Sequence, residues 1–372
     1  MPKPLKSLSI CHAIQVFVTV MLLQFTSVGA RGQGVVENVV LVTLDGLRPE
    51  ELFTGGDRRL MVEQNGVDDP EKLKSLFWRD DPKERRELLL PFLWSECNTG
   101  NAWIAGDVEN NSRVLVKNTR YFSYPGYNEI LTGAPDLRID SNDKKYNENL
   151  TVLEWLHGKA EFENRIAAYC SWDVFPFIVN DKRSGIPVNA GWQPLTVGNP
   201  DRIAALNFVA EQLFHEWDGV RYDSFTISGA IEELKTNKPR VLFVSLGETD
   251  DWAHAGRYDR YLITARQNDF FIRSLWELTQ ELPAYREKTL FLVTTDHGRG
   301  YGREGWKSHG KDLPGSERIW VAAFGAGLAK HGIDRDGEFE QGQIAATIAK
   351  ALGHDFTKVS NEIRQPLPIL AD

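Results

Sequence analysis

The sequence predicts an α/β fold in which a mainly parallel, doubly wound sheet is covered by helices on both faces, with small cap insertions. Three observations support this prediction. Short runs of apolar and β-branched residues recur along the chain, segments of helical periodicity lie between several of them, and the runs are nearly continuous in hydrophobicity. A strand that is buried on both faces has this continuous pattern, whereas a strand with one wet face alternates.

The individual elements follow from these patterns. The expected strands are residues 37–44, 113–117, 165–171, 240–246, 288–295 and 318–324. Apolar residues recur every three or four positions in the expected helices, which include residues 202–217, 258–281 and 340–352. Because strands alternate with helices, functional groups are expected at the carboxyl ends of the parallel strands.

The first thirty residues differ from the rest of the chain. Lys3 and Lys6 precede a short apolar run, and Val28 and Ala30 occupy the −3 and −1 positions of a cleavage site. We interpret residues 1–30 as a secretory signal peptide; a membrane anchor is the less favoured alternative because the run is short for a membrane span. Residues 31–372 then form a single domain of a secreted or periplasmic protein, without a stable membrane anchor after cleavage.

Composition and charge narrow the function. The chain has 372 residues, 42% of them hydrophobic, and a net charge of −9, which becomes −11 without the two lysines of residues 1–30. An acidic protein of this kind is not expected to have nucleic acid as its main partner. Two cysteines, Cys97 and Cys170, remain after residue 30; one disulfide is possible in an exported protein, and the sequence leaves the pairing open.

The stretch from about residue 54 to 90 is crowded with charges, as in "DDPEKLK" and "RDDPKERREL". A dense mixture of both signs is typical of a solvated helical surface. We therefore expect a charged helical insertion here, and a part in a cap over the functional site is the less favoured reading.

Carboxylates and imidazoles follow the central strands. Asp45 comes directly after the first strand, "GETDDWAHAGRYD" follows residues 240–246, "DHGRG" follows residues 288–295, and "GWKSHG" comes soon after. Each of these motifs has a simpler explanation by itself: Asp-Gly favours a turn, and a lone histidine is more often structural. Together, however, they bring aspartates and histidines to one edge of the predicted sheet.

The spacing of these groups suits metal binding. Asp250 and His254 are four residues apart and share one face if the segment is helical, although an ordinary polar pair has the same spacing. Asp296, His297 and His309 add three further ligand atoms. Aspartate and histidine are suited to zinc-like divalent ions, and Mn²⁺ or Fe are alternatives. We therefore expect two divalent metal ions, with Zn²⁺ fitting the ligands best.

A nucleophile is expected in "RYFSYPGYNEILTG", residues 120–133. Ser123 precedes a proline suited to a first helical turn, and the short helix is expected to end at Gly133. Backbone N–H groups at a helix N-terminus favour an anion, and a bound cation lowers the pKa of a hydroxyl. A helix-capping role for Ser123 is the simpler alternative.

The order of these motifs resembles the alkaline phosphatase superfamily, in particular its type I phosphodiesterase/nucleotide pyrophosphatase and related phosphatase branch. The resemblance runs from Asp45 to His309. It implies that residues 31–372 are an alkaline phosphatase-like catalytic domain. It also implies that Asp250, His254 and His309 bind one zinc, and that Asp45, Asp296 and His297 bind the second, which Ser123 contacts as the nucleophile. A covalent seryl intermediate that is then hydrolysed is implied as well.

Further residues are proposed by position. An asparagine about twenty residues after the nucleophile often donates to the substrate in this branch; we favour Asn142 over Asn147 for its spacing. Lys182 and Arg183 are candidates for binding the extra charge of a monoester, and a solvated basic turn is the alternative. The branch usually has Thr-Phe-Pro-Asn-His where this chain has "SYPGY", residues 123–127. A formylglycine sulfatase would need arginine at Tyr127, which argues against that subgroup.

The sequence therefore predicts an exported, metal-dependent phosphoric ester hydrolase that acts on a small-molecule phosphate or sulfate ester, with monoesters slightly preferred over diesters. A sulfuric ester or phosphonate hydrolase, or a phosphotransferase, on the same scaffold is the first alternative. A non-catalytic, metal-stabilised binding protein is the second and is less favoured, because neither a ligand nor the nucleophile is missing.

Overall fold

The computed structural model describes residues 35–371, and its main element is a sheet with the order β10-β2-β9-β7-β1-β6-β4-β5. From β7 through β1, β6 and β4 to β5, neighbouring strands pair in parallel. Strand β9, in contrast, runs antiparallel to both β7 and β2. The strands are β1 Asn38–Leu44, β2 Ala102–Ala105, β4 Ile166–Cys170, β5 Val188–Ala190, β6 Val241–Leu246, β7 Thr289–Thr294, β9 Val321–Gly325 and β10 Gly332–Ile333. The predicted α/β class with a mainly parallel sheet is confirmed.

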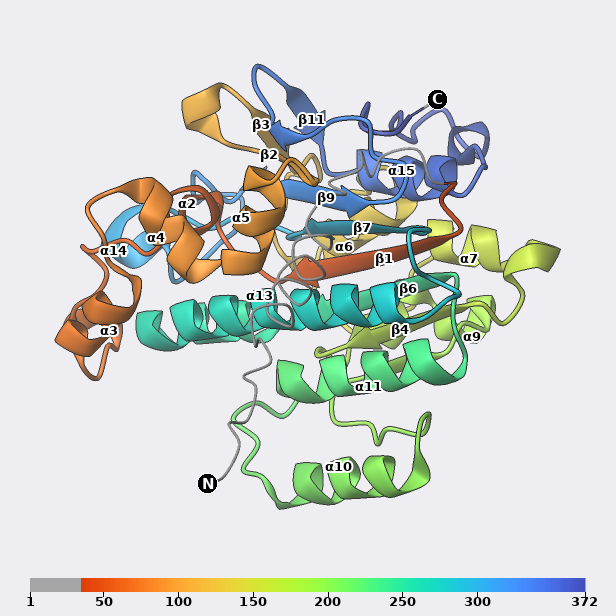
Figure 1. Cartoon of the computed structure of the whole chain (residues 1–372), viewed down its shortest axis with the longest axis horizontal. Coiled ribbons are helices and arrows are strands. Elements are labelled where there is room, and N and C mark those ends of the chain that lie inside the picture. The colour runs from red at the N-terminus through yellow and green to blue at the C-terminus, as the bar shows by residue number, and fades with distance from the viewer. Residues whose placement is uncertain (1–34, 372) are drawn as a thin grey trace, which may run out of the picture. The chain divides into compact units, whose positions relative to one another are not determined.

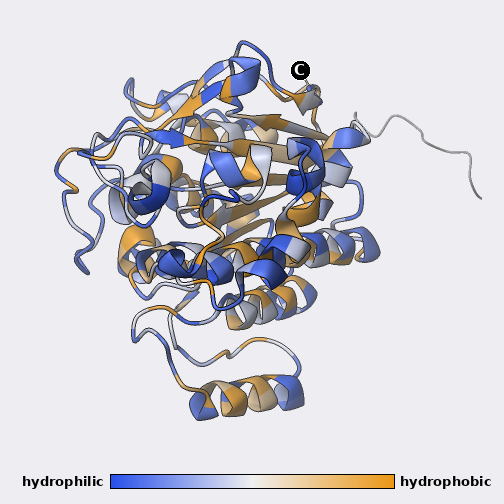
Figure 2. Cartoon of the chain, turned by 90° about the vertical axis from the view of Figure 1, so that its left-hand side faces the viewer, coloured by the Kyte–Doolittle hydropathy of each residue, from blue (hydrophilic) through white to orange (hydrophobic). Residues whose placement is uncertain are grey.

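The central strands are buried from end to end. Every residue of β1, β6 and β7 is buried, and β1 pairs in parallel with β6 on one side and β7 on the other. This burial explains why their sequences are apolar without alternation. Figure 2 shows these strands as a largely hydrophobic interior beneath more hydrophilic helices.

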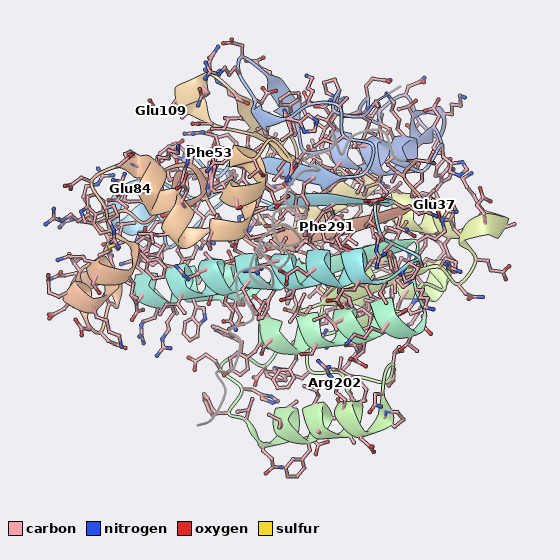
Figure 3. All side chains as sticks on the ribbon, in the orientation of Figure 1. Glu37, Phe53, Glu84, Glu109, Arg202 and Phe291 are labelled. Atoms are coloured by element: carbon pink, nitrogen blue, oxygen red, sulfur yellow. The ribbon has the colours of Figure 1, made fainter. Side chains whose placement is uncertain are left out.

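Helices cover both faces of the sheet (Figure 1). One hydrophobic core joins alternate residues of β1 with helices α5 (Pro91–Asn98), α11 (Asp223–Thr236) and α13 (Tyr258–Glu281). The other joins the remaining β1 residues with α6 (Ser123–Thr132), α7 (Val152–His157), α8 (Phe175–Val179) and α15 (Gln343–Ala351). In Figure 3, Phe291 of β7 lies in the first core, where its ring stacks on Phe324 at 5.0 Å between centroids.

Seven further α-helices belong to the described residues. They are α2 (Pro49–Thr54), α3 (Pro70–Phe77), α4 (Pro82–Leu89), α9 (Asp181–Ser184), α10 (Pro200–Gln212), α12 (Glu248–His254) and α14 (Gly302–Gly305). The charged stretch at residues 54–90 contains α3 and α4, whose Leu73, Phe77 and Leu89 are buried. Charged residues such as Glu84 lie on the outside (Figure 3). Among residues 35–371, no helix has the length and apolar character needed to cross a membrane.

Three details differ from the sequence prediction. Residues 113–117 contain β3 (Arg113–Leu115), which joins β8 (Arg318–Ile319) and β11 (Glu338–Glu340) in a second, three-stranded sheet. The predicted strand at 318–324 is therefore divided between two sheets. The helix predicted at 202–217 ends at Gln212, and the Trp217 carbonyl beyond it accepts a hydrogen bond from the Trp192 indole, a tertiary contact outside the helix.

Cys97 and Cys170 are both buried and both free, and they belong to the cores on opposite faces of the sheet. They do not form the disulfide that the sequence left open. The predicted signal peptide, residues 1–30, lies outside the described residues.

Candidate metal centre and active site

Three adjacent strands of the sheet deliver the candidate ligands to one edge. Asp45 follows the last residue of β1, Asp296 and His297 follow β7, and α12 begins two residues after β6 and carries Asp250 and His254. Because β7, β1 and β6 are parallel neighbours, their carboxyl ends meet at the same edge. The candidate ligands therefore lie together in space, as expected for groups at the carboxyl ends of parallel strands.

Helix α6 carries Ser123 as its first residue, after Phe122 in an extended conformation. The helix lies so close to the end of β7 that a Cβ atom at Gly126 would be 2.4 Å from the Asp296 carbonyl oxygen. Glycine is therefore required at this position of the helix. The helix ends at Gly133, whose φ of +81° is a left-handed cap, as the sequence predicts. This packing places Ser123 Oγ 3.4 Å from His297 Nε2.

We call Asp45, Asp296 and His297 the inner half of the site. The His297 Nε2 atom lies 3.4 Å from a carboxylate oxygen of Asp45 and 3.4 Å from one of Asp296. One oxygen of each carboxylate has a hydrogen-bond donor: Tyr127 Oη donates to Asp45 Oδ2 and the Gly46 N–H donates to Asp296 Oδ1. The other two oxygens, Asp45 Oδ1 and Asp296 Oδ2, are buried without a partner. Two orphaned carboxylate oxygens facing one imidazole are the arrangement that a divalent cation fits.

We call Asp250, His254 and His309 the outer half of the site. The Nε2 atoms of His254 and His309 are 3.0 Å apart, and they lie 3.2 and 3.6 Å from the two carboxylate oxygens of Asp250. The His297 ring stacks on His309 with 3.8 Å between centroids, so His297 also lies within ligand distance of Asp250 and His309. The six predicted ligands therefore form one continuous cluster, and His297 lies where its two halves meet.

The backbone orients two of the imidazoles. The Nδ1 atom of His297 is 2.9 Å from the carbonyl oxygen of Gly298, and that of His309 is 3.0 Å from the carbonyl oxygen of Tyr121. A carbonyl oxygen only accepts, so Nδ1 carries the hydrogen in each ring and Nε2 has its lone pair free. This is the tautomer that binds a metal ion through Nε2.

The pKa values in the cluster follow from burial and from neighbouring charge. Burial, together with the charge of Asp250, raises the pKa of Asp296 to about 8, and burial with the charges of Asp296 and Asp250 raises that of Asp45 well above its usual value. Burial lowers the pKa of His309 to about 4 and that of His297 well below its ordinary value. Burial therefore disfavours the charged form of the inner carboxyl groups, and it keeps His297 and His309 neutral, which is the state that binds metal.

Asp250 differs, because a protein cation compensates it. Burial opposes the shift, but the Arg299 guanidinium holds the pKa of Asp250 well below its ordinary value. Arg299 is fully buried and bonds Asp250 Oδ1 through Nη1. The outer carboxylate thus has a bonded cation, whereas no arginine or lysine of the described residues bonds the inner carboxylates Asp45 and Asp296.

The other predicted site residues lie around the cluster. The Asn142 side-chain oxygen accepts a hydrogen bond of 3.0 Å from the Tyr124 N–H in the first turn of α6, beside Ser123. Arg183 bonds Glu154 with two nitrogens and also the carbonyl oxygens of residues 148 and 149. Lys182 lies over the Tyr146 ring, 4.6 Å from its centroid. The structure therefore places Asn142 beside Ser123, whereas Lys182 and Arg183 contact other residues.

Sequence reasoning missed two residues of this site. In the sequence, Tyr127 is notable only as the position where a formylglycine sulfatase would need arginine, yet its hydroxyl donates to Asp45 and accepts from Ser245 Oγ. A signal existed, since Tyr127 lies four residues after Ser123 and thus on the same helix face. Arg299 stands in the quoted motif "DHGRG", but a cation among metal ligands runs against simple charge complementarity. Its position is set by the tertiary fold.

No protein-family model matches this chain, and no curated protein matches it by sequence. Its structure is similar to that of the alkaline phosphatase PafA, with a TM-score of 0.59 and 11% identity over 92% of this chain and 100% of that one. It is also similar to a phosphonate monoester hydrolase from Silicibacter pomeroyi, with a TM-score of 0.52 and 11% identity over 89% and 76% of the two chains. The lipoteichoic acid synthase LtaP from Listeria monocytogenes has a TM-score of 0.50 and 12% identity over 91% and 78%.

These likenesses span nearly the whole described chain and agree with the order of the motifs in the sequence. At such low identity they establish the architecture. The chain therefore has the fold of the alkaline phosphatase superfamily.

Proposed function

We propose that this protein is a metal-dependent phosphoric ester hydrolase in which Ser123 is the nucleophile and two divalent cations, Zn²⁺ by preference, bind the inner and outer halves of the site. The observation that carries the proposal is the position of Ser123 Oγ, 3.4 Å from His297 Nε2, next to two buried carboxylate oxygens that have no partner. The fold shared with PafA and with a phosphonate monoester hydrolase supports the same class of reaction.

The reaction proceeds in two displacements. Ser123 Oγ forms a bond to phosphorus, the bond from phosphorus to the leaving-group oxygen breaks, and the hydroxyl proton passes to solvent. Water then attacks phosphorus, the bond to Ser123 Oγ breaks, and the serine hydroxyl takes up a proton. Divalent cations, when bound, supply the charge that lowers the pKa of the hydroxyl and stabilises the leaving oxygen.

The other residues of the chain orient the reacting groups. Asn142 uses its side-chain oxygen to accept from the Tyr124 N–H, so its NH₂ group remains free to donate to a substrate oxygen beside Ser123. Tyr127 holds Asp45 through one oxygen and leaves the other turned to the cation site. The Tyr124 N–H is used by Asn142 and Pro125 has no N–H, so the first turn of α6 contributes the positive end of the helix dipole beside Ser123.

The sequence-based preference for monoesters over diesters depends on Lys182 and Arg183. Arg183 is engaged by Glu154, and Lys182 lies on Tyr146. We therefore propose a phosphoric ester as the substrate class, and the assay below distinguishes a monoester from a diester. Sulfate and phosphonate esters, and transfer to an acceptor other than water, belong to the same test.

The test is hydrolysis of matched nitrophenyl esters by the zinc-loaded protein. The panel contains a phosphate monoester, a phosphate diester, a phosphonate ester and a sulfate ester with the same leaving group. Ser123→Ala is expected to lower kcat/KM for the preferred ester by roughly 10³-fold or more while metal binding stays intact. Ser228→Ala, a serine on α11 that donates to the Ser224 carbonyl, is the matched control.

Two results would contradict the proposal. If the zinc-loaded protein hydrolyses none of the four esters, the chain is a metal-stabilised binding protein. If Ser123→Ala retains turnover, the reaction uses water directly and Ser123 serves as part of α6 alone.

Export is proposed together with this function. The structure describes no residue of the predicted signal peptide, so the proposal rests on Lys3, Lys6 and the site at Val28 and Ala30. N-terminal sequencing of protein recovered from outside the cytoplasm is expected to begin at Arg31. A chain that keeps residue 1 would exclude cleavage.

A further inference from the structure

Arg299 connects several segments that form the site. Its Nε donates to the Trp306 carbonyl at 2.7 Å and its Nη2 to the Lys307 carbonyl at 2.9 Å, two residues before His309. Its Nη1 bonds Asp250 Oδ1 on α12. All three nitrogens of the guanidinium are therefore used, and the residue is 1% exposed.

The turn after β1 leaves room for this guanidinium. A Cβ atom at Gly46 would lie 2.6 Å from Arg299 Nη1 and 2.8 Å from Asp250 Oδ1, and the backbone at Gly46 has a φ of +60°. A larger residue there would push on both charged groups. The glycine in this turn thus leaves space for the buried Arg299 guanidinium, which contacts the candidate metal ligand Asp250.

This arrangement makes the two halves of the site unequal. The inner half has two buried carboxylates with an unpartnered oxygen each, and its side chains are 0–7% exposed. The outer half has one carboxylate, already bonded by Arg299, and His254 is 43% exposed. Two cations that share one carboxylate repel each other, and a carboxylate that accepts a charged hydrogen bond is a weaker ligand.

We propose that Arg299 is a built-in cation that shares Asp250 with the outer metal ion, so that the outer ion binds more weakly and exchanges while the inner ion stays bound. The inference rests on the proposed two-metal function and adds an order of affinity to it. Its structural consequence is that Asp250 and the loop of His309 remain in place when the outer ion leaves, because Arg299 bridges them.

The experiment is a titration of metal-free, full-length protein with Zn²⁺ in the presence of a competing chelator, with native mass spectrometry to count bound ions. The wild-type protein is expected to bind one Zn²⁺ tightly and a second at least roughly tenfold more weakly, the scale on which neighbours of metal ligands change affinity. Arg299→Met is expected to strengthen the second step by a similar factor and leave the first unchanged.

Arg299→Lys separates charge from shape. Lysine lacks the planar fork that bonds both carbonyls and Asp250, but it keeps the positive charge. Because the charge remains, the difference in affinity between the first and the second Zn²⁺ is expected to persist. Arg221→Met is the matched control: Arg221 is equally buried, and its hydrogen bonds go to Asn189 and Thr226. Arg221→Met is expected to leave both zinc constants unchanged.

Each outcome has one meaning. Equal affinities in the wild-type protein, or a second step in Arg299→Met that is unchanged or weaker, would overturn the inference while leaving the proposed function in place. If wild-type protein binds no Zn²⁺, the proposed function itself fails. Should Arg299→Met fail to fold, the wild-type titration still decides whether the halves differ, and Arg299→Gln replaces it as the variant without charge.

Discussion

The inner and outer halves of the site use the same residue types in opposite surroundings. Asp45, Asp296 and His297 are buried, and two of their carboxylate oxygens have no partner. Asp250 is bonded by Arg299, and His254 is 43% exposed. The pKa of Asp296 in the inner half is therefore raised, whereas that of Asp250 in the outer half is lowered. The type of a candidate ligand therefore does not by itself decide how far a bound cation would stabilise it; the neighbouring charge also contributes.

Removing one carboxylate from each half is the most direct test of the difference between the two halves. Asp296→Asn takes away the residue that faces both His297 and the unpaired oxygen of Asp45, so we expect loss of the tight Zn²⁺ and a fall of roughly 10³-fold in kcat/KM. Asp250→Asn is expected to lose the weak Zn²⁺ and keep the tight one. Zinc counts and steady-state rates on both variants check this. Retention of the tight ion in Asp296→Asn would contradict the difference between the halves.

Metal removal measures how much the inner half depends on a cation. Because an ion that binds only the folded state stabilises it by mass action, saturating Zn²⁺ is expected to add about 4 kcal/mol at a thousandfold excess over Kd. Calorimetry with and without a chelator gives the shift in Tm, and Asp296→Asn is the control, in which the shift should shrink. An equal shift in that variant would place the stabilising ion elsewhere.

Tyr127→Phe weakens the inner half without changing a ligand. The substitution leaves Asp45 Oδ2 without its donor, so we expect Zn²⁺ affinity to fall roughly tenfold in the tight step. Tyr124→Phe is the matched control in the same helix, since the Tyr124 hydroxyl donates to the Lys145 carbonyl. If the two variants bind zinc alike, the bond from Tyr127 to Asp45 has no part in metal binding.

The stability of the metal-free protein is expected to depend on pH through the shifted pKa values in the site. The pKa of Asp296 is about 8 in the folded state and lies near its ordinary value of 3.8 in the unfolded state, so the folded state binds more protons between these values. Stability contributed by the protonated carboxyl is therefore lost as pH rises from about 4 to about 8. His309, with a folded pKa of about 4, acts oppositely, but only below its ordinary value of 6.5.

Denaturant melts at pH 6.5 and 8.5 test this dependence. The metal-free protein is expected to be less stable at pH 8.5, and saturating Zn²⁺ should remove the difference, because a bound cation keeps the carboxylates charged at both values. The same drop in Asp296→Asn would assign it to another group.

The smallest effect is expected at Arg183, outside both halves. Its partly exposed ion pair with Glu154 is worth about 1 kcal/mol of stability at most. We expect kcat/KM of Arg183→Ala to stay within about threefold of wild type, since a lost bond to a phosphoryl group would cost tenfold or more. Kinetics with a monoester and a diester make the check, and a loss confined to the monoester would restore the role first assigned to Arg183.

The sequence predicted most of the scaffold because continuous apolar runs mark doubly buried strands. Residues 37–44, 240–246 and 288–295 are the three central strands, and the groups that follow them meet because neighbouring parallel strands end at one edge. The helix from Ser123 to its glycine cap was predicted by local rules as well. These features depend on residues close together in the chain.

The remaining features depend on contacts between distant residues. The division of residues 318–324 between two sheets requires β3 and β11, which short runs do not reveal. Arg299 reaches Asp250 across 49 positions of sequence, and the bond from Tyr127 to Asp45 spans 82. Local patterns predict the candidate ligands, but they do not show which charged or hydroxyl group lies beside each one.

The bond between the Gly46 N–H and Asp296 joins residues 250 positions apart, and His309 comes later still. A chain emerging from the ribosome cannot close this site until nearly all of it has been made, and closing so long a loop has an entropic cost that is repaid only when the central strands pair. The candidate metal centre can therefore form only after residues 45 to 309 have all been made and have come together. A chain that stops before residue 309 lacks His309 and also β9 and β10, so both the candidate centre and the main sheet are incomplete.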